Sequence, residues 1–412
     1  MVRIALISDI HFGKDARAKE FSLPDDSPNG HEEYAPSLSE GAICKMKEMK
    51  VEYLFVAGDL TSVGSPAEYH FCEKKIMEIA EKSGISREHI IWCVGNHDND
   101  WQISRLYDAY EGAEAKVLEI SREKYRKMAT SVASANMSIF PSYICEGPLP
   151  MTGIYKDEKI VTFILNSSTW CVHGKSIDHG KLTNEQLKWF EEKALEYAND
   201  PKWKIVLMHH HPFNYPYPVP GLDVSQLEEG SEFCKIAGKY GINLVIHGHR
   251  HHPQCKTTKE NEWKAPISFV CGGSFSVNES ERKKGDIPNT FHIIELLEEV
   301  GDLKLYTYEY SIGGGWRNAV GYRDVVPLDY MMRLGKNFSK EEIEEALRKL
   351  LKLANNESFV RWEQLEAPFL YMSSEYMSDL IKNSEFFSGF DVKVHPQEGL
   401  FMRKKSNNEV PL

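Results

Sequence analysis

Short apolar runs alternate with amphipathic stretches along the first ninety residues of the chain. Three of the apolar runs predict buried strands, at residues 2–7, 53–57 and 89–94. Residues 37–49 have helical spacing, and Ser65-Pro66-Ala67-Glu68 is a capping box with proline at the first helical position, which predicts a helix to about Lys82. This order predicts an α/β fold in which helices cover a sheet and functional loops gather at the carboxyl ends of the strands.

The pattern continues after a more polar segment, residues 101–150, which we interpret as a helical insertion that caps the site or packs beside it. A capping box at Thr183 begins a helix that ends near Ala198, and a helix over residues 231–240 ends at Gly241, a residue type suited to a C-cap. Further strands are predicted at residues 160–165, 204–208, 243–246, 267–270, 290–296 and 303–310. We expect the last three strands to complete a second sheet.

The triplet Gly313-Gly314-Gly315 marks a break in the pattern. We therefore predict a main domain over residues 1–320 and a small C-terminal α+β extension over 321–412. The extension has helical patterns at 339–354 and 373–382, followed by a predicted hairpin of residues 390–394 and 400–403. A winged helix has the same order, but a tail packed on the main domain is the interpretation that we favour. The extension is a possible site for contact with a second copy of the chain or with a protein partner.

Composition places the chain among ordinary globular proteins, with 412 residues, 42% of them hydrophobic and 27% charged. The formal net charge of −12 argues against nucleic acid as a partner. Eight cysteines without a CxxC pair are typical of a reduced intracellular protein. We find neither a signal-peptide pattern nor an apolar run of about 18 residues. We therefore expect a cytoplasmic protein that has no membrane partner.

Five polar clusters carry the candidate chemistry, and four of them directly follow a predicted strand. The clusters are Asp9-Ile10-His11, Gly58-Asp59, Gly95-Asn96-His97-Asp98, His209-His210-His211-Pro212 and Gly248-His249-Arg250-His251. Each has a plainer interpretation alone, because an aspartate or a Gly-Asp pair after a strand is often part of a turn. Together they supply the carboxylate, amide and imidazole ligands that divalent metals prefer. The set predicts two metal ions that share one carboxylate, an arrangement suited to hydrolysis of phosphate esters.

The five clusters resemble the signature of the calcineurin-like metallophosphoesterase superfamily over residues 1–310. This resemblance implies a four-layer αββα sandwich, with two mixed sheets flanked by helices, and makes residues 1–320 the catalytic domain. Three segments most resemble the class III cyclic-nucleotide phosphodiesterases and the related glycerophosphodiesterases: Gly58-Asp59-Leu60-Thr61, Gly95-Asn96-His97-Asp98, and Asp178-His179-Gly180 with Gln186-Leu187.

The resemblance also implies a role for each residue of the clusters. It assigns the first ion to Asp9, His11, Asp59 and His251, and the second ion to Asp59, Asn96, His210 and His249. His97 is not a ligand by this resemblance. It would face the substrate and protonate the leaving oxygen, with Asp98 orienting its ring.

The triple histidine leaves one ligand position open. The family pattern His-x-Pro selects His210, whereas strand alternation counted from Lys204 favours His209. We favour His210 on the family pattern.

The expected function is a phosphodiesterase in which a hydroxide bridging two ions attacks phosphorus in line. Iron, manganese or zinc are the expected metals, and a small phosphodiester such as a cyclic nucleotide is the expected substrate. A phosphomonoesterase or protein phosphatase is the alternative within the same chemistry, ahead of a nuclease or a non-catalytic scaffold.

Overall fold

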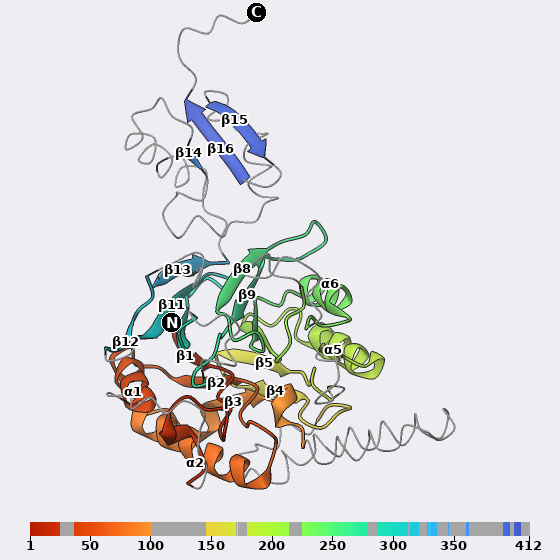
Figure 1. The fold of residues 1–412 in the computed structure, drawn as a ribbon. Coiled ribbons are helices and arrows are strands. Elements are labelled where there is room, and N and C mark those ends of the chain that lie inside the picture. The colour runs from red at the N-terminus through yellow and green to blue at the C-terminus, as the bar shows by residue number, and fades with distance from the viewer. Residues whose placement is uncertain are drawn as a thin grey trace, which may run out of the picture.

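The computed structural model describes residues 1–24, 37–100, 146–169, 171, 179–213, 225–278, 287–311, 314–320, 328, 330–335, 345, 360–361, 390–395 and 399–404. Most of these residues form two β-sheets with helices on their outer faces (Figure 1). The predicted insertion falls almost wholly outside the described residues. So do the helices predicted at 339–354 and 373–382.

The first sheet has the strand order β12-β11-β10-β1-β2-β3, and β13 also pairs with β11. Strands β1, β2 and β3 are parallel, as their order in the chain predicts. Two helices of the described residues connect them, α1 between β1 and β2 and α2 between β2 and β3. The elements are β1 (Val2–Ile7), α1 (Leu38–Glu48), β2 (Tyr53–Ala57), α2 (Pro66–Ser83), β3 (Ile90–Cys93), β10 (Thr290–Leu296), β11 (Leu303–Ser311), β12 (Gly315–Asn318) and β13 (Met331–Leu334).

The second sheet has the order β4-β5-β6-β7-β9-β8. Its inner strands β5, β6, β7 and β9 are parallel, and the edge strands β4 and β8 are antiparallel to their neighbours. Helix α5 connects β5 to β6, and α6 connects β6 to β7. The elements are β4 (Gly153–Lys156), β5 (Ile160–Ile164), α5 (Asn184–Glu196), β6 (Trp203–Leu207), α6 (Gly230–Tyr240), β7 (Leu244–His247), β8 (Gln254–Thr258) and β9 (Ile267–Cys271).

Two of the three strands expected to complete the second sheet lie in the first. Strand β10 pairs with β1 in antiparallel register, with Ile4 opposite Ile294, and β11 pairs with β10. The prediction was wrong because it followed the order of the chain. The open edge of β1 needs a hydrogen-bonded neighbour, and a strand almost three hundred residues away provides it.

The layers follow from the alternation of side chains along the strands. In β6, Ile205 and Leu207 belong to the core that contains the first sheet, whereas Val206 packs with Phe190 of α5 and Phe233 of α6. Successive residues of a strand point to opposite faces, so one strand can serve both layers. The expected four-layer αββα sandwich is confirmed.

The helix boundaries also match the capping patterns. The Ser65 side chain accepts a hydrogen bond from Glu68 N, and the Glu68 carboxylate accepts one from Ser65 N. The Thr183 hydroxyl accepts from Gln186 N at the start of α5, and Gly241 follows α6 with a φ of 76°. These ends were predictable because a cap depends only on residues close in sequence.

The residues described beyond 345 form a three-stranded sheet of order β14-β16-β15. Its strands are β14 (Val360–Arg361), β15 (Phe390–His395) and β16 (Gly399–Lys404), and β15 with β16 confirms the predicted hairpin. Of the glycine triplet, Gly315 begins β12 and pairs with Ser311 at the end of the antiparallel strand β11, while Gly313 lies outside the described residues. Strand β13 lies after residue 320 in sequence but pairs with β11, so the first sheet includes residues of the predicted extension. The division of the chain into domains at residue 320 stays a prediction. No helix among the described residues is long and apolar enough to cross a membrane.

Candidate metal centre

All five polar clusters lie just beyond the carboxyl ends of parallel strands. The loops after β1 and β2 continue the pairing of those strands, because Asp9 N donates to Gly58 O over 3.0 Å and His11 N donates to Asp59 O over 2.9 Å. In the second sheet, Gly248 N donates to His209 O over 3.0 Å. Five loops distant in sequence therefore meet at one edge of the sandwich.

The backbone at these loops is unusual. Five of the predicted ligands have a positive φ: Asp9 (50°), His11 (50°), Asp59 (50°), His249 (75°) and His251 (53°). Among the described non-glycine residues, Lys50 and Met151 are the other two with positive φ. Residues with a Cβ pay a steric cost in this region, and such strain gathers at functional sites. Positive φ thus occurs at five of the seven ligands that the sequence pattern selected.

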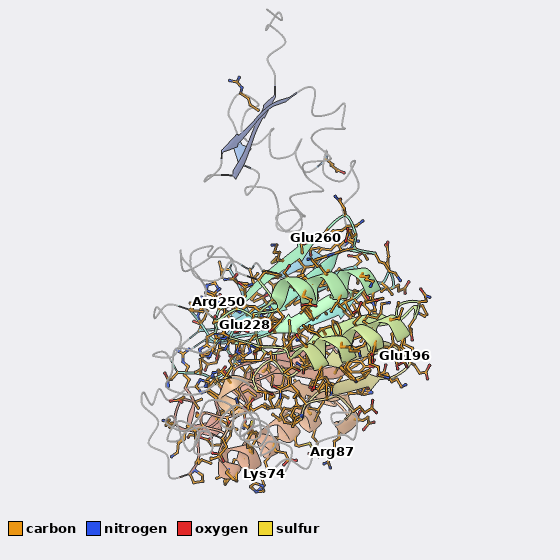
Figure 2. The ribbon with its side chains drawn as sticks, turned by 90° about the vertical axis from the view of Figure 1, so that its right-hand side faces the viewer. Lys74, Arg87, Glu196, Glu228, Arg250 and Glu260 are labelled. Carbon is orange, nitrogen blue, oxygen red and sulfur yellow. The ribbon has the colours of Figure 1, made fainter. Side chains whose placement is uncertain are left out.

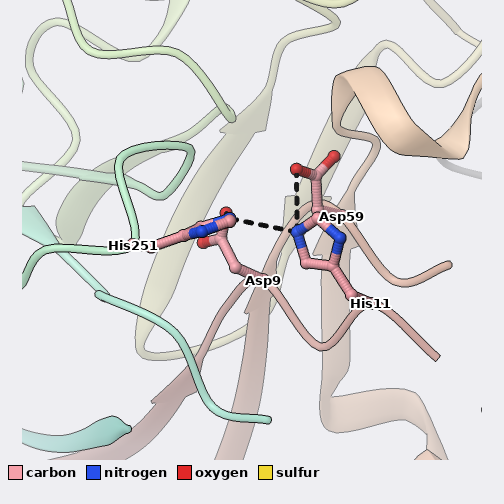
Figure 3. A group of neighbouring side chains, drawn as sticks. All are labelled: Asp9, His11, Asp59 and His251. Carbon is pink, nitrogen blue, oxygen red and sulfur yellow. Dashed lines mark hydrogen bonds and ion pairs between the residues drawn. The ribbon is translucent and has the colours of Figure 1, made fainter. Parts of the chain in front are cut away.

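The first group of side chains is Asp9, His11, Asp59 and His251, whose candidate ligand atoms all lie within 4.8 Å of one another. His11 Nε2 lies 3.4 Å from Asp59 Oδ2 and 3.0 Å from His251 Nε2, as Figure 3 shows. His251 Nε2 lies 3.3 Å from Asp9 Oδ1. Two carboxylates and two imidazoles therefore converge on one small, buried volume.

The second group is Asp59, His209 and His249, again with ligand atoms within 4.8 Å of one another. The Asn96 carbonyl oxygen joins this group, because Oδ1 lies 3.2 Å from His209 Nε2 and 3.0 Å from His249 Nδ1. His209 Nδ1 donates to the Ala57 carbonyl over 2.8 Å, which leaves Nε2 to face Asp59 Oδ2 at 3.2 Å. The second group therefore contains one carboxylate, one amide oxygen and two imidazoles.

The Asp59 carboxylate belongs to both groups. Its Oδ2 faces His11 on one side and His209 on the other, while Oδ1 accepts a hydrogen bond from His97 N over 2.8 Å. Burial opposes its ionisation, but His209 and His97 outweigh this effect and hold the pKa of Asp59 well below its usual range. Asp59 is therefore an ionised carboxylate placed between two sets of nitrogen and oxygen donors.

The donor chemistry fits two divalent ions. Burial, with His97 nearby, lowers the pKa of His11 to about 4, and burial with His210 nearby holds that of His249 well below its usual range. These rings are neutral near pH 7, which is the form that binds metal. Without a metal, burial opposes protonation of His209, but Asp59 raises its pKa to about 9. Positive charge is thus favoured beside Asp59, and a bound cation supplies it.

The structure separates the two candidates of the triple histidine. His209 lies on the side of Leu207, which faces the first sheet, and so it reaches Asp59 and Asn96. The His210 ring points the other way. Its Nδ1 lies 2.9 Å from Ser167 Oγ and its Nε2 lies 3.6 Å from Cys171 Sγ. The physical reason for these orientations is the two-residue alternation of β6, which continues past its end. The assignment of His210 as a ligand from the His-x-Pro pattern stays a prediction.

His97 and Asp98 lie beside the centre but make different contacts. The His97 ring lies 4.4 Å from the His11 ring, centre to centre, and His97 Nδ1 donates to the Ser62 carbonyl over 2.9 Å. The Asp98 carboxylate accepts from Gly95 N over 2.8 Å and from Thr61 N over 3.0 Å. Asp98 thus joins the loops after β2 and β3, and the Ser62 carbonyl accepts a hydrogen bond from the His97 ring.

Two residues near the centre had no clear signal in the sequence. Ser62 is fully buried, donates its hydroxyl to His11 O and accepts a hydrogen bond from Asp15 N. Asp15 follows the first cluster, and its position in sequence is typical of a charged, solvent-exposed loop residue. In the structure, however, its carboxylate lies within 4.8 Å of ring nitrogens of His11 and His97. Arg17, in the same loop, is instead buried against Asn289. The sequence did not distinguish Asp15 from Arg17. In the folded loop, Asp15 lies beside the centre and Arg17 does not.

Comparison with solved structures finds distant similarity. A purple acid phosphatase from yellow lupin (Lupinus luteus) seeds has 14% identity over 75% of this chain and 51% of that chain, with a TM-score of 0.44. A dimetal phosphatase from Danio rerio has 10% identity over 82% and 99%, with a TM-score of 0.45. A putative 5′-nucleotidase from Staphylococcus aureus has 12% identity over 86% and 59%, with a TM-score of 0.37. The chain spans about half the length of the lupin protein, and similarity at this level indicates neither substrate nor metal.

Comparison by sequence gives a sharper result. No curated protein matches the chain. The model of the calcineurin-like phosphoesterase family, however, matches residues 2–253, which is more than half of the chain and includes all five clusters. The chain therefore belongs to the calcineurin-like phosphoesterase family, a membership that implies a phosphoric ester hydrolase with a metal-binding His/Asp centre.

Proposed function

We propose that this protein is a dinuclear metal-dependent phosphodiesterase. The observation that carries the proposal is the position of Asp59, whose carboxylate belongs to both groups of candidate ligands. Two ions that share a carboxylate lie about 3.5–4 Å apart in enzymes of this chemistry. When bound, they polarise the phosphate oxygens and lower the pKa of water.

The proposed ligands follow the two groups. Asp9, His11, Asp59 and His251 would hold the first ion, and Asp59, Asn96, His209 and His249 would hold the second. His209 takes the place that the family pattern suggested for His210. Iron, manganese and zinc all suit this mixture of imidazole and carboxylate ligands, and availability decides between them.

His97 is the proposed proton donor. Its Nδ1 carries a hydrogen, because the Ser62 carbonyl at 2.9 Å can only accept. Nε2 therefore carries a proton for the substrate only when the ring is doubly protonated. In that form His97 would hydrogen-bond from Nε2 to a phosphate oxygen and then transfer this one proton to the leaving oxygen, which avoids release of a free alkoxide and leaves the ring neutral. Asp98 would help to keep His97 in position, because its carboxylate joins the loops of Gly95 and Thr61 through hydrogen bonds.

The preference for diesters rests on the motifs that resemble class III phosphodiesterases. In the structure, Thr61 of the Gly58–Thr61 motif bonds to Asp98 of the Gly95–Asp98 motif, so the two act as one unit. Gly180 of the third motif approaches the His210 ring so closely that an added Cβ would lie 2.4 Å from it. The proposed substrate is a small phosphodiester such as a cyclic nucleotide, and a phosphomonoester is the alternative.

Metal-reconstituted enzyme tests the proposal. With Mn²⁺, we expect faster hydrolysis of bis(p-nitrophenyl) phosphate than of p-nitrophenyl phosphate, and measurable turnover of a cyclic nucleotide. Asp59→Asn should lose bound metal and activity together, whereas Glu196→Gln on exposed α5 is a control that should lose neither. A clear preference of the natural sequence for the monoester would contradict the diesterase assignment. Full activity of Asp59→Asn would contradict the shared-carboxylate site.

A further inference from the structure

The loop that carries Asp15 is fixed on both of its sides. Phe12 forms a β-bridge with Thr61, and Ala16 forms one with Val277. The backbone of Asp15 itself is held at both ends, because its N–H donates to Ser62 Oγ over 3.2 Å and its carbonyl accepts from Asn278 N over 2.9 Å. The Asp15 carboxylate is therefore presented from a rigid position.

This carboxylate lies beside the two imidazoles that border Asp59. An Asp15 oxygen and ring nitrogens of His11 and His97 lie within 4.8 Å of one another. Ser62 fixes all three residues, through hydrogen bonds to His11 O, to Asp15 N and to the His97 ring. Asp15 is half-buried, so its negative charge is only partly screened by water.

We propose that Asp15 is a specificity-determining residue whose negative charge disfavours phosphate groups with a second negative charge. The inference rests on the proposed function, which places the phosphate beside Asp59 and His97. A diester carries one negative charge on its phosphate group, whereas a monoester dianion carries two near neutral pH. In this proposal the Asp15 carboxylate repels the second negative charge of a monoester. In a diester, an uncharged ester substituent takes the place of that charged oxygen. Asp15 thus makes a site that could bind both monoesters and diesters selective for diesters.

The expected size of the effect follows from simple electrostatics. One extra unit of charge a few ångströms from a partly buried carboxylate changes relative reactivity by about tenfold or more. Removal of the Asp15 charge should therefore raise kcat/KM for a monoester relative to a diester by about tenfold. The change should shrink at about 1 M salt, where the Debye length falls to about 3 Å.

The experiment compares Asp15→Asn and Asp15→Glu with the natural sequence in the Mn-reconstituted protein. The readouts are kcat/KM for p-nitrophenyl phosphate and bis(p-nitrophenyl) phosphate, and bound metal per chain. We expect Asp15→Asn to raise the monoester-to-diester ratio about tenfold at low salt with unchanged metal content, and Asp15→Glu to keep the ratio near its natural value. Because Asp15 is half-buried, its replacement should leave folding intact, and Asp15→Ser provides a second neutral variant.

Glu196→Gln is the control for net charge. Figure 2 shows Glu196 on the opposite side of the view from Arg250, which lies between the candidate ligands His249 and His251 in sequence. This variant loses one negative charge far from the centre, and its ratio should not change. An unchanged ratio in both neutral Asp15 variants would overturn the inference. So would loss of bound metal from Asp15→Asn, because Asp15 would then be a ligand together with His11 and His97.

Failure of the inference can be distinguished from failure of the proposed function. If the natural sequence prefers the monoester, the diesterase assignment falls. The Asp15 inference is judged by the change in the ratio relative to the natural sequence, and a tenfold rise would still support it in that case.

Discussion

His209 Nε2 lies 3.2 Å from Asp59 Oδ2, although the two residues follow strands of different sheets. A second bond strengthens this connection, because His209 Nδ1 donates to the Ala57 carbonyl over 2.8 Å. The candidate centre thus spans the boundary between the sheets. Its geometry therefore depends on how the two sheets pack against each other.

Replacement of His209 and His210 should have different effects. His209→Ala should lose about one metal ion per chain and reduce kcat by more than about 100-fold, because a ligand of the second ion is removed. His210→Ala should keep both ions and lower metal affinity by at most about 10–100-fold, as expected for a residue that contacts a ligand ring. Metal analysis and kinetics on both variants check this, and the reverse order of effects would restore His210 as the ligand.

Replacement of His97 should slow turnover without loss of metal. His97→Ala should keep two ions per chain and reduce kcat by about 10²–10⁴-fold for a substrate with an alkoxide leaving group. The loss should be smaller for p-nitrophenolate, a good leaving group that needs little protonation. An equal loss for both leaving groups would show that His97 acts on the phosphate rather than on the leaving oxygen.

Asp98 should contribute mainly to stability and loop geometry. Asp98→Ala leaves Gly95 N and Thr61 N without their buried acceptor, and each such loss costs about 1–3 kcal/mol. We expect the free energy of unfolding to fall by about 2–4 kcal/mol in denaturant titrations of metal-free protein. Glu88→Gln at an exposed position is the matched control. A fully stable Asp98→Ala protein with slow turnover would instead support the role expected from the resemblance, in which Asp98 orients the His97 ring.

Gly248 should be intolerant of any side chain. A Cβ there would lie 2.0 Å from Ser8 Oγ and 2.5 Å from Asp9 Oδ2, so Gly248→Ala should displace both side chains and weaken binding of the first ion. Gly84→Ala is the contrasting variant, because its φ is 79° but no atom lies within 4 Å of the added Cβ. It should cost about 1–2 kcal/mol of stability and leave metal content unchanged. Metal analysis and thermal unfolding check both, and normal metal content in Gly248→Ala would contradict the steric argument.

Much of the fold was predictable from short segments. Strands at Val2–Ile7 and Tyr53–Ala57 have the expected boundaries, and the cap at Ser65 begins α2 at the next residue. These features depend on residues that are neighbours in sequence. Strand β10 was assigned to the wrong sheet, because the pairing of Ile4 with Ile294 is chosen by the open edge of β1 in the folded molecule.

The same division applies to the candidate centre. The sequence alone determined which loops contain carboxylate, amide and imidazole side chains, since ligand chemistry and strand ends are local properties. The tertiary structure decided that Asp59 lies between two groups, that His209 rather than His210 faces it, and that Asp15 borders His97. These relationships join residues of different strands and sheets. Their distances are set by packing between layers, which no local pattern of residues specifies.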